Sequence, residues 1–157
     1  MHEASISSYD SPLGKIMIAC DDEGLTLLSF GQPCAEEGAG HPVINDAKRW
    51  LDVYFAGDVP DFTPPLHYEG TDFQRRVWKA LLGVPYGRTT TYKAIADELG
   101  CRSAQAVGQA VGRNPISIII PCHRVIGSDG SLTGYAGGLE RKAALLRLEG
   151  VKISPLP

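Results

Sequence analysis

The fold is decided by residues 90–125, which read TTYKAIADELGCRSAQAVGQAVGRNPISIIIPCHRV. After a helix cap at Thr90 or Thr91, apolar side chains recur at helical spacing: Tyr92, Ile95, Ala96 and Leu99. Ser103 caps a second short helix, which we expect over residues 104–112 and which ends before Pro115. Two short helices joined by a turn at residues 100–102 predict a helix-turn-helix.

The second of these helices carries almost no bulky side chains. Small residues occupy every other position: Ala104, Ala106, Gly108, Ala110 and Gly112. Glycine costs up to about 1 kcal/mol relative to alanine inside a helix, so two glycines here indicate that another surface approaches closely. The sequence leaves two interpretations open, namely tight packing against another helix and a face that lies in a narrow groove of nucleic acid.

The segments on either side predict an α/β (α+β) fold. Alternating apolar residues indicate three antiparallel strands at residues 6–9, 15–20 and 25–30, and a helix over 47–55, capped by Asn45, covers one face of this sheet. Thr71 and Gln74 form a capping box that opens a helix ending at Gly83. The apolar run 116–120 predicts a buried strand, and a last helix is expected over residues 139–149.

Residues 57–70 are interrupted by proline and glycine and predict a linker. We therefore expect two domains, an N-terminal α/β domain over residues 1–70 and a mainly helical domain over residues 71–157, which contains the helix-turn-helix. Residues 1–70 carry a charge of −9 and residues 71–157 a charge of +6, which together make the net −3. This asymmetry is either ordinary scatter of surface charge or a sign that the second domain binds a polyanion.

The composition is that of an ordinary globular protein. The chain has 157 residues, of which 43% are hydrophobic and 21% charged, and this excludes low-complexity disorder. No apolar run approaches the roughly 20 residues that a membrane helix needs. The first residues also lack the basic start and apolar core of a secretory signal. We expect a cytoplasmic protein that does not associate with membranes.

The cysteines show no disulfide or zinc-finger pattern. Cys20, Cys34, Cys101 and Cys122 lie far apart, and Cys20 with His2 does not make a full zinc ligand set. We expect reduced thiols and no metal site.

Cys122 differs from the other cysteines because His123 and Arg124 follow it directly. Nearby cations lower the pKa of a thiol from about 8.5, and the thiolate is the nucleophile. Three interpretations remain open: a core thiol beside an unrelated imidazole, a zinc site, and a reactive thiol.

Several motifs together resemble the O6-alkylguanine-DNA alkyltransferases, also called methylated-DNA–protein-cysteine methyltransferases. They are NPISIIIPCHRVIG at residues 114–127, GYAGGL at 134–139, the closing stretch 142–150, SPLGK at 11–15, and F-x-x-x-V-W at 73–78. The combination of PCHRV with an upstream Asn-Pro and a downstream Gly-Tyr-x-Gly-Gly is highly specific. The resemblance covers nearly the whole chain.

The resemblance implies a chemical role for five residues. Cys122 would accept an alkyl group from guanine O6 and become a permanent thioether, His123 would activate it through a water molecule, and Glu149 would orient His123. Asn114 would hold the hinge before the cysteine, and Tyr92 would help to turn the nucleotide out of the duplex and hydrogen-bond guanine N3. Without the resemblance, Glu149 is more simply a solvated charge and Tyr92 a half-buried packing residue.

The resemblance also implies a base pocket and a DNA-contacting surface. A base must leave the duplex, at a cost of a few kcal/mol, before a protein thiol can reach its O6 atom. The pocket would be formed by Val125, Tyr135, Ala136 and Gly137, with main-chain groups of Cys122, Val125 and Ala136 reading the guanine edge. The second helix would lie in the minor groove, with DNA contacts from Tyr92, Arg102, Ser103, Ala104, Gln105, Ala106, Gly108 and Arg113.

One position departs from the family pattern. The family usually places an arginine in the second helix, inserted into the duplex where the flipped base was, and Gln105 stands at that position here. Glutamine can hydrogen-bond the orphaned cytosine, but it has no charge and a smaller stacking plane than guanidinium. We therefore expect base extrusion with weaker DNA binding or slower repair.

The resemblance thus implies a suicidal methylated-DNA–protein-cysteine S-methyltransferase for DNA repair. It would act on O6-alkylguanine in double-stranded DNA, with O4-alkylthymine as a further candidate, in a single turnover, as a monomer and without a cofactor. Two alternatives stay open: a non-catalytic sensor of alkylated DNA, whose known relatives lack the acceptor cysteine, and an unrelated cysteine hydrolase that uses Cys122 and His123.

Overall fold

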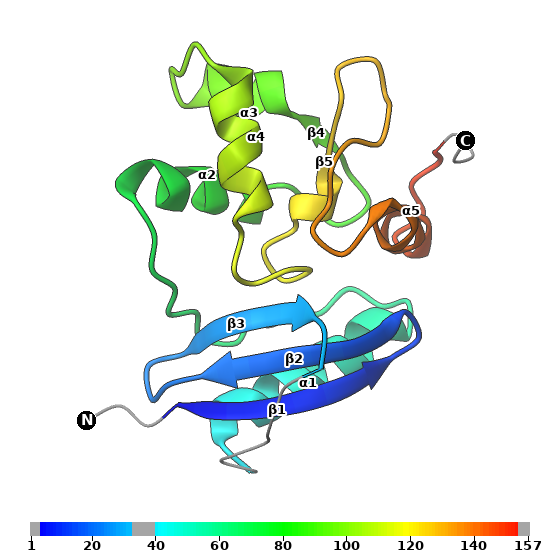
Figure 1. Cartoon of the computed structure of the whole chain (residues 1–157). Coiled ribbons are helices and arrows are strands. Elements are labelled where there is room, and N and C mark those ends of the chain that lie inside the picture. Colours follow the sequence, from blue (N-terminus) through cyan, green and yellow to red (C-terminus); the bar gives the residue numbers. More distant parts are fainter. Residues whose placement is uncertain (1–3, 33–39, 154–157) are drawn as a thin grey trace. The chain divides into compact units, whose positions relative to one another are not determined.

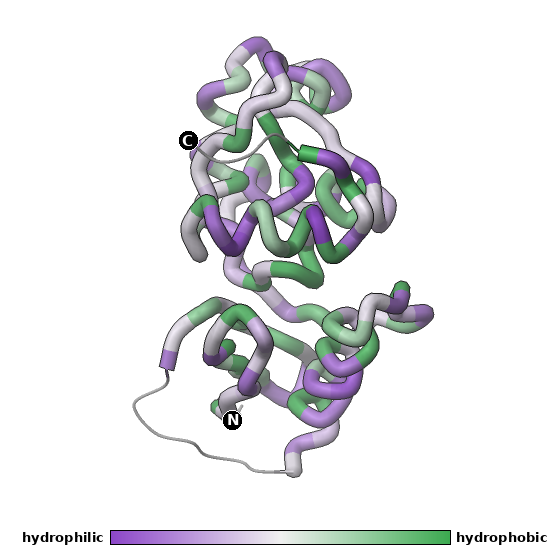
Figure 2. The backbone as a smooth tube through the Cα atoms, turned by 90° about the vertical axis from the view of Figure 1, so that its right-hand side faces the viewer, coloured by the Kyte–Doolittle hydropathy of each residue, from purple (hydrophilic) through white to green (hydrophobic). Residues whose placement is uncertain are grey.

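The computed structural model describes residues 4–32 and 40–153, and the chain divides into two compact units, Met1–Glu69 and Gly70–Pro157. Figure 1 shows a small sheet with a helix beside it in the first unit and a mainly helical second unit. Hydrophobic and hydrophilic residues alternate along the trace of both units, as expected for amphipathic elements (Figure 2). Among the described residues, no helix is both long and apolar enough to cross a membrane.

The first unit contains a three-stranded antiparallel sheet in the order β1-β2-β3, which confirms the predicted strands. The strands are β1 (Ser5–Ser11), β2 (Gly14–Cys20) and β3 (Leu25–Phe30). Ser5 lies opposite Cys20 and Ser11 opposite Gly14, while a bulge at Ala19/Cys20 shifts the register between β2 and β3. Alternate residues of β2, namely Ile16, Ile18 and Cys20, point into the core.

Helix α1 (Pro42–Phe55) contacts all three strands and buries its apolar face, which includes Ile44, Ala47, Leu51 and Tyr54. The helix begins earlier than predicted, and Asn45 is not its cap. Instead, Nδ1 of His41 accepts a hydrogen bond from the Val43 N–H at 3.1 Å. Proline is well suited to the first helical position because its fixed φ fits the helix and no N–H is needed there.

The residues predicted to form a linker are partly anchored to the sheet. The Leu25 N–H donates to Pro65 O at 2.8 Å, and the His67 N–H donates to Leu25 O at 2.7 Å. A Cβ atom at Gly24 would lie 2.6 Å from Pro65 O, so this close approach requires glycine. The absence of hydrophobic periodicity in this stretch therefore does not mean that its backbone is free.

The second unit is built from four helices: α2 (Asp72–Leu82), α3 (Tyr92–Glu98), α4 (Ala104–Gly112) and α5 (Leu139–Leu148). The predicted caps are confirmed, because the side chains of Thr71, Thr91 and Ser103 accept hydrogen bonds from the first turns of α2, α3 and α4. Trp78 Nε1 donates to Ala110 O at 2.8 Å and ties α2 to α4. Two-residue strands β4 (Thr90–Thr91) and β5 (Val125–Ile126) pair in parallel, and both are too short to show a sequence pattern.

The prediction of a strand over residues 116–120 is wrong. Residues 117–119 form a turn, and the Ile120 N–H donates to Ile116 O at 3.1 Å and the Ile119 N–H to Ser117 O at 2.8 Å. Ile118 adopts a φ of 70°, a strained conformation for a β-branched residue. A short apolar run only indicates burial, because it lacks the periodicity that separates a strand from other buried structure. Cys122 consequently lies on a short 3-10 helix, η1 (Cys122–Arg124), and not on a strand.

Two carboxylates bind His67 in the first unit. Its Nδ1 atom lies 2.6 Å from Asp21 Oδ2, and its Nε2 atom lies 3.0 Å from Glu23 Oε2. The hydrogen bond to Asp21, with the charges of Asp21 and Glu23, raises the pKa of His67 above its ordinary value. The stabilisation that follows is complete below the unfolded-state pKa of about 6.5 and is lost as the pH rises through the raised folded-state pKa.

We predict that the His67 imidazole titrates above about pH 6.5 when its NMR resonances are followed from pH 5 to 9. Asp21→Asn removes the main partner and moves the pKa back down. The matched control is Asp22→Asn, because Asp22 lies 3.3 Å from His41 rather than against His67. An unchanged His67 pKa in Asp21→Asn would contradict this assignment.

Candidate active site

The candidate site lies in the second unit, where η1 meets the end of α5. Cys122, His123 and Arg124 form the single turn of η1, and Glu149 is the C-terminal cap residue of α5. All four residues are buried, with His123 fully enclosed. The structure thus brings together Cys122, His123 and Glu149, as expected from the resemblance, and adds Arg124.

The carboxylate of Glu149 is shared by several donors. Arg124 binds it with two bonds, from Nε to Oε1 at 2.7 Å and from Nη2 to Oε2 at 3.0 Å. The Gly87 N–H donates to Oε1 at 3.1 Å, and His123 Nε2 lies 2.6 Å from Oε2. Arg124 also donates from Nη1 to Val84 O at 2.7 Å. The charge of this buried carboxylate is therefore balanced by the guanidinium of Arg124, which binds it in a bidentate ion pair.

This arrangement selects one tautomer of His123. A carboxylate paired with arginine only accepts hydrogen bonds, so the proton of the neutral imidazole sits on Nε2. Nδ1 keeps its lone pair, is buried, and has no hydrogen-bond partner among the described residues. Burial lowers the pKa of His123, and the opposing effect of Glu149 does not overcome it. His123 is therefore a neutral imidazole with a free basic nitrogen, directly adjacent in the chain to Cys122.

The thiol of Cys122 experiences opposing effects. Burial raises its pKa, whereas hydrogen bonding by Asn114 and Ser117 and the positive charge of Lys142 act to lower it. Because burial dominates, the thiol is protonated at rest and needs a base before it can act as a nucleophile.

Asn114 joins the end of α4 to the turns that precede the cysteine. Its Oδ1 accepts from the Ile116 N–H at 2.9 Å, and its Nδ2 donates to Ile120 O at 2.8 Å. One side chain thereby closes both ends of the irregular segment. These two bonds fix the conformation of the segment that connects α4 to η1.

Lys142 links the surroundings of Cys122 to Thr133 and Tyr92. It is fully buried, and its Nζ donates to Thr133 O at 2.5 Å. Burial lowers its pKa to about 8, while the charge of Cys122 acts in the opposite direction. The hydroxyl of Thr133 in turn donates to the Tyr92 hydroxyl at 3.0 Å. Tyr92 is therefore linked through Thr133 and Lys142 to the surroundings of Cys122.

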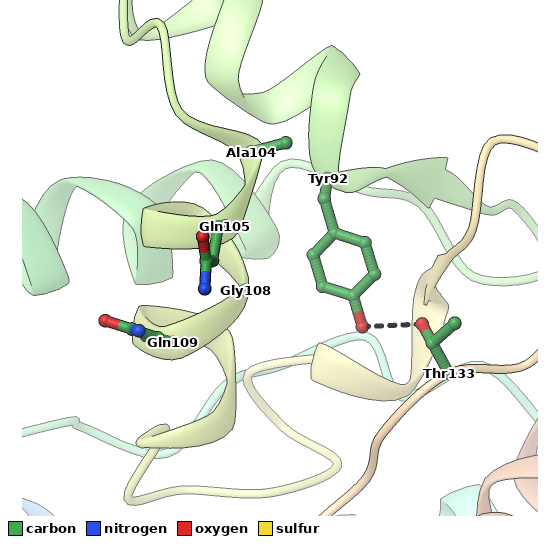
Figure 3. Close-up of a pocket in the computed structure, with 6 residues that line it drawn as sticks. All are labelled: Tyr92, Ala104, Gln105, Gly108, Gln109 and Thr133. Atoms are coloured by element: carbon green, nitrogen blue, oxygen red, sulfur yellow. Dashed lines mark hydrogen bonds between the residues drawn. The ribbon is translucent and has the colours of Figure 1, made fainter.

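An open hollow of about 500 Å³ lies beside Tyr92 (Figure 3). It is lined by Tyr92, Thr133 and four residues of α4, which are Ala104, Gln105, Gly108 and Gln109. A Cβ atom at position 108 would lie 3.6 Å from the Tyr92 ring, which is an ordinary contact, so glycine keeps the space between α4 and this ring open. The opposite face of α4 buries Val107, Ala110 and Val111. Valines and Ala110 thus pack on one face of α4, while the small residues Ala104 and Gly108 leave the other face open.

The remaining predicted residues occupy more varied positions. Arg102 and Arg113 are exposed near the two ends of α4, whereas Ser103 caps the helix and Ala106 is half-buried outside the hollow. Val125 is buried directly after η1. Tyr135 lies close enough to Cys122 for a thiolate charge to affect it, and burial raises its pKa. Ala136 is exposed, and Gly137 lies with it in a turn closed by a bond from the Gly138 N–H to Tyr135 O at 2.9 Å.

Sequence reasoning missed four contributors to this site: Gly87, Arg124, Thr133 and Lys142. Arg124 was visible beside Cys122, but nothing in the spacing pairs it with a residue that lies 25 positions away. Cys20, Cys101 and Cys122 are free thiols, while Cys34 and His2 lie outside the described residues. Within the described part of the chain, no group of three or more His, Cys, Asp or Glu side chains is placed to hold a metal ion.

The fold and the site define a class of protein in which a buried cysteine adjoins a histidine–carboxylate pair. Comparisons with known proteins narrow this class. Residues 72–151 match the family model described as 6-O-methylguanine DNA methyltransferase, DNA binding domain, and residues 6–68 match its ribonuclease-like domain. The chain belongs to the family of methylated-DNA–protein-cysteine methyltransferases.

Individual relatives align with this chain along most of their length. The methylated-DNA–protein-cysteine methyltransferase of Methanosarcina barkeri is 51% identical over 147 residues, which cover 89% of this chain and 93% of the relative. The crystal structure of Mycobacterium tuberculosis O6-methylguanine methyltransferase aligns with a TM-score of 0.84 and 46% identity over 94% of this chain and 93% of that one. A crystal structure of the M. tuberculosis protein in complex with DNA aligns with a TM-score of 0.81 and 47% identity over 90% of both chains.

We predict that Glu149→Gln destabilises the second unit strongly. The neutral amide leaves the buried guanidinium of Arg124 without its counter-charge, and breaking a buried pair in this way costs about 3–5 kcal/mol. The free energy of unfolding, measured by urea denaturation, should fall by about that amount.

The matched control is Glu98→Gln at the exposed end of α3, which should change the unfolding free energy by less than about 0.5 kcal/mol. Equal effects of the two substitutions would show that Glu149 does not carry the buried charge network.

Proposed function

We propose that this chain repairs DNA by moving an alkyl group from guanine O6 to its own Cys122, once per molecule. The observation that carries this proposal is the buried pairing of Glu149 with both His123 and Arg124, which leaves a neutral imidazole with a free nitrogen beside the cysteine. The names of the similar proteins point to the same chemistry. O4-alkylthymine is a further candidate substrate.

The reaction balances with the groups of the site. His123 takes the thiol proton at Nδ1 through a bridging water, and the thiolate attacks the alkyl carbon. A sulfur–carbon bond forms as the carbon–O6 bond breaks, and the electron pair of that bond stays with guanine, which takes up the proton that His123 received from the thiol. A hydrogen bond from the Tyr92 hydroxyl to guanine N3 favours the negative charge that develops on the base. Because the thioether is stable, each molecule acts once and needs no cofactor.

Access to a base requires that it leaves the duplex. We propose that the open face of α4 enters the minor groove, with Tyr92 crowding the phosphate and Gln105 occupying the place of the extruded base. Val125, Tyr135, Ala136 and Gly137 form the pocket that receives it. The hollow beside Tyr92 supports this mode of binding, and the structure of the M. tuberculosis relative in complex with DNA supports DNA as the partner.

The charge distribution agrees with different roles for the two parts of the chain. Residues 71–157 carry +6 and hold every group of the proposed site, so we assign DNA binding and alkyl transfer to this part and regard residues 1–70 as a separate domain. Contacts with phosphates come from exposed cations such as Arg102 and Arg113 and are sensitive to salt. A monomer suffices, because all of the proposed catalytic side chains belong to one copy of the chain.

We predict that incubation with a duplex containing one O6-methylguanine adds the mass of one methylene to the intact protein. Peptide mass spectrometry should place the addition on Cys122 at a stoichiometry of one, with no increase on longer incubation. Cys122→Ala abolishes the addition.

Cys101→Ala serves as the matched control, because Cys101 is a more accessible free thiol and its loss should leave methylation intact. Binding to the lesion without any methyl gain would favour a sensor of alkylated DNA, and turnover of an ester or amide would favour a hydrolase.

We predict that Gln105→Arg strengthens DNA binding and speeds alkyl transfer. The guanidinium adds charge and a larger stacking plane at the position of the extruded base, and the position itself is exposed on α4, so folding is unaffected. Fluorescence anisotropy and quenched-flow methylation provide the two readouts. Unchanged affinity together with an unchanged transfer rate would contradict the assigned place of Gln105.

A further inference from the structure

Gln109 lies one helical turn beyond Gln105 and lines the same hollow (Figure 3). Both side chains are exposed, and neither amide hydrogen-bonds to another residue in the described part of the chain. The caps of α4 are Ser103 and Arg113, so Gln109 does not cap its own helix. Its polar atoms are therefore free to bind something outside the protein.

Neutral and positively charged residues occupy different places along α4, and they suit two different kinds of contact with DNA. Helix α4 reads AQAVGQAVG and contains no charged residue, whereas Arg102 and Arg113 stand near its two ends. Cations bind phosphates without regard to sequence, while neutral amides are suited to base edges. The arrangement places amides at the centre of the open face and cations at its margins.

The spacing between Gln105 and Gln109 along α4 predicts which base pair Gln109 contacts. Four residues of helix rise by about 6 Å, and base pairs repeat about every 3.4 Å. If Gln105 occupies the position of the extruded base, Gln109 reaches roughly two base pairs away from it when α4 follows the groove.

We propose that Gln109 reads the 2-amino group of guanine in a base pair beside the lesion, and this inference rests on the proposed function. In the minor groove every base pair presents acceptors, and only G·C adds a donor, which is guanine N2. The amide nitrogen of glutamine therefore finds a partner at any base pair and distinguishes nothing. Its carbonyl oxygen finds a donor only at G·C, so Gln109 gives this protein a preference for lesions with a nearby guanine.

Inosine tests this directly, because an I·C pair differs from G·C only by the missing 2-amino group. A set of duplexes carries one O6-methylguanine and has G·C or I·C at each position one to three steps away, on either strand. The rate of methylation of Cys122 is measured with the full chain, and equilibrium binding is measured with the Cys122→Ser variant. We expect wild-type binding and transfer to be about two- to tenfold better with G·C at one of these positions, the value of one neutral hydrogen bond.

Gln109→Leu should still methylate Cys122, but its ratio of G·C to I·C performance should lie about two- to tenfold below the wild-type ratio, because the hydrogen bond to guanine N2 is lost. Leucine has a similar size and helix propensity, so α4 is preserved. Inosine also weakens base pairing and eases base opening, but this effect is the same for wild type and variant and cancels in the comparison. Arg113→Ala is the matched control for a phosphate contact, since it should weaken binding to all duplexes alike and reduce the salt dependence by about one charge.

A ratio of G·C to I·C performance that is the same in the wild type and in Gln109→Leu at every position would overturn the inference. Failure of the proposed function looks different, because Cys122 would then remain unmethylated on every duplex. Methylation without a flanking preference would remove the role of Gln109 and leave the alkyltransferase proposal in place.

Discussion

Four N–H groups converge on the buried carboxylate of Glu149: two from Arg124, one from the Gly87 backbone and one from His123. Removing a charge from water is expensive, and only a complete set of well-placed partners repays the cost. The carboxylate therefore holds together the segment after α2, the turn η1 and the end of α5. The same contact gives His123 its tautomer, so the stability of the fold and the basicity of the site depend on one group.

The segment that leads into η1 is also held by Asn114, which follows the end of α4. Asn114 closes the irregular segment 114–120 with two hydrogen bonds, and this segment leads directly into η1. On the outer face, Tyr92 bonds to Thr133, whose carbonyl binds the buried ammonium of Lys142. Binding at the open face of α4 is thus coupled by short, defined contacts to the surroundings of Cys122. The proposed alkyl transfer needs this coupling, because the base must be extruded and the thiol activated at the same place.

Much of this architecture is predictable from local sequence. The strands of the first unit follow from alternation, and Thr71, Thr91 and Ser103 mark helix starts because capping is a contact between near neighbours. Residues 116–120 were wrongly predicted as a strand, since an apolar run indicates burial without periodicity. The partnership of Arg124 with Glu149 escaped prediction because it joins distant positions. Family resemblance predicts Cys122, His123 and Glu149 as site residues, whereas their local chemistry alone leaves several interpretations open.

The central claim is that burial keeps His123 neutral and that Glu149 fixes its proton on Nε2, which leaves a free lone pair on Nδ1. Nitrogen-15 NMR of the imidazole in the full, unmethylated chain measures this directly, because protonated and unprotonated ring nitrogens have well-separated chemical shifts. The account predicts a single Nε2–H tautomer at neutral pH, with a titration below the ordinary range because burial lowers the pKa of His123. A proton on Nδ1, or a doubly protonated ring at neutral pH, would contradict it.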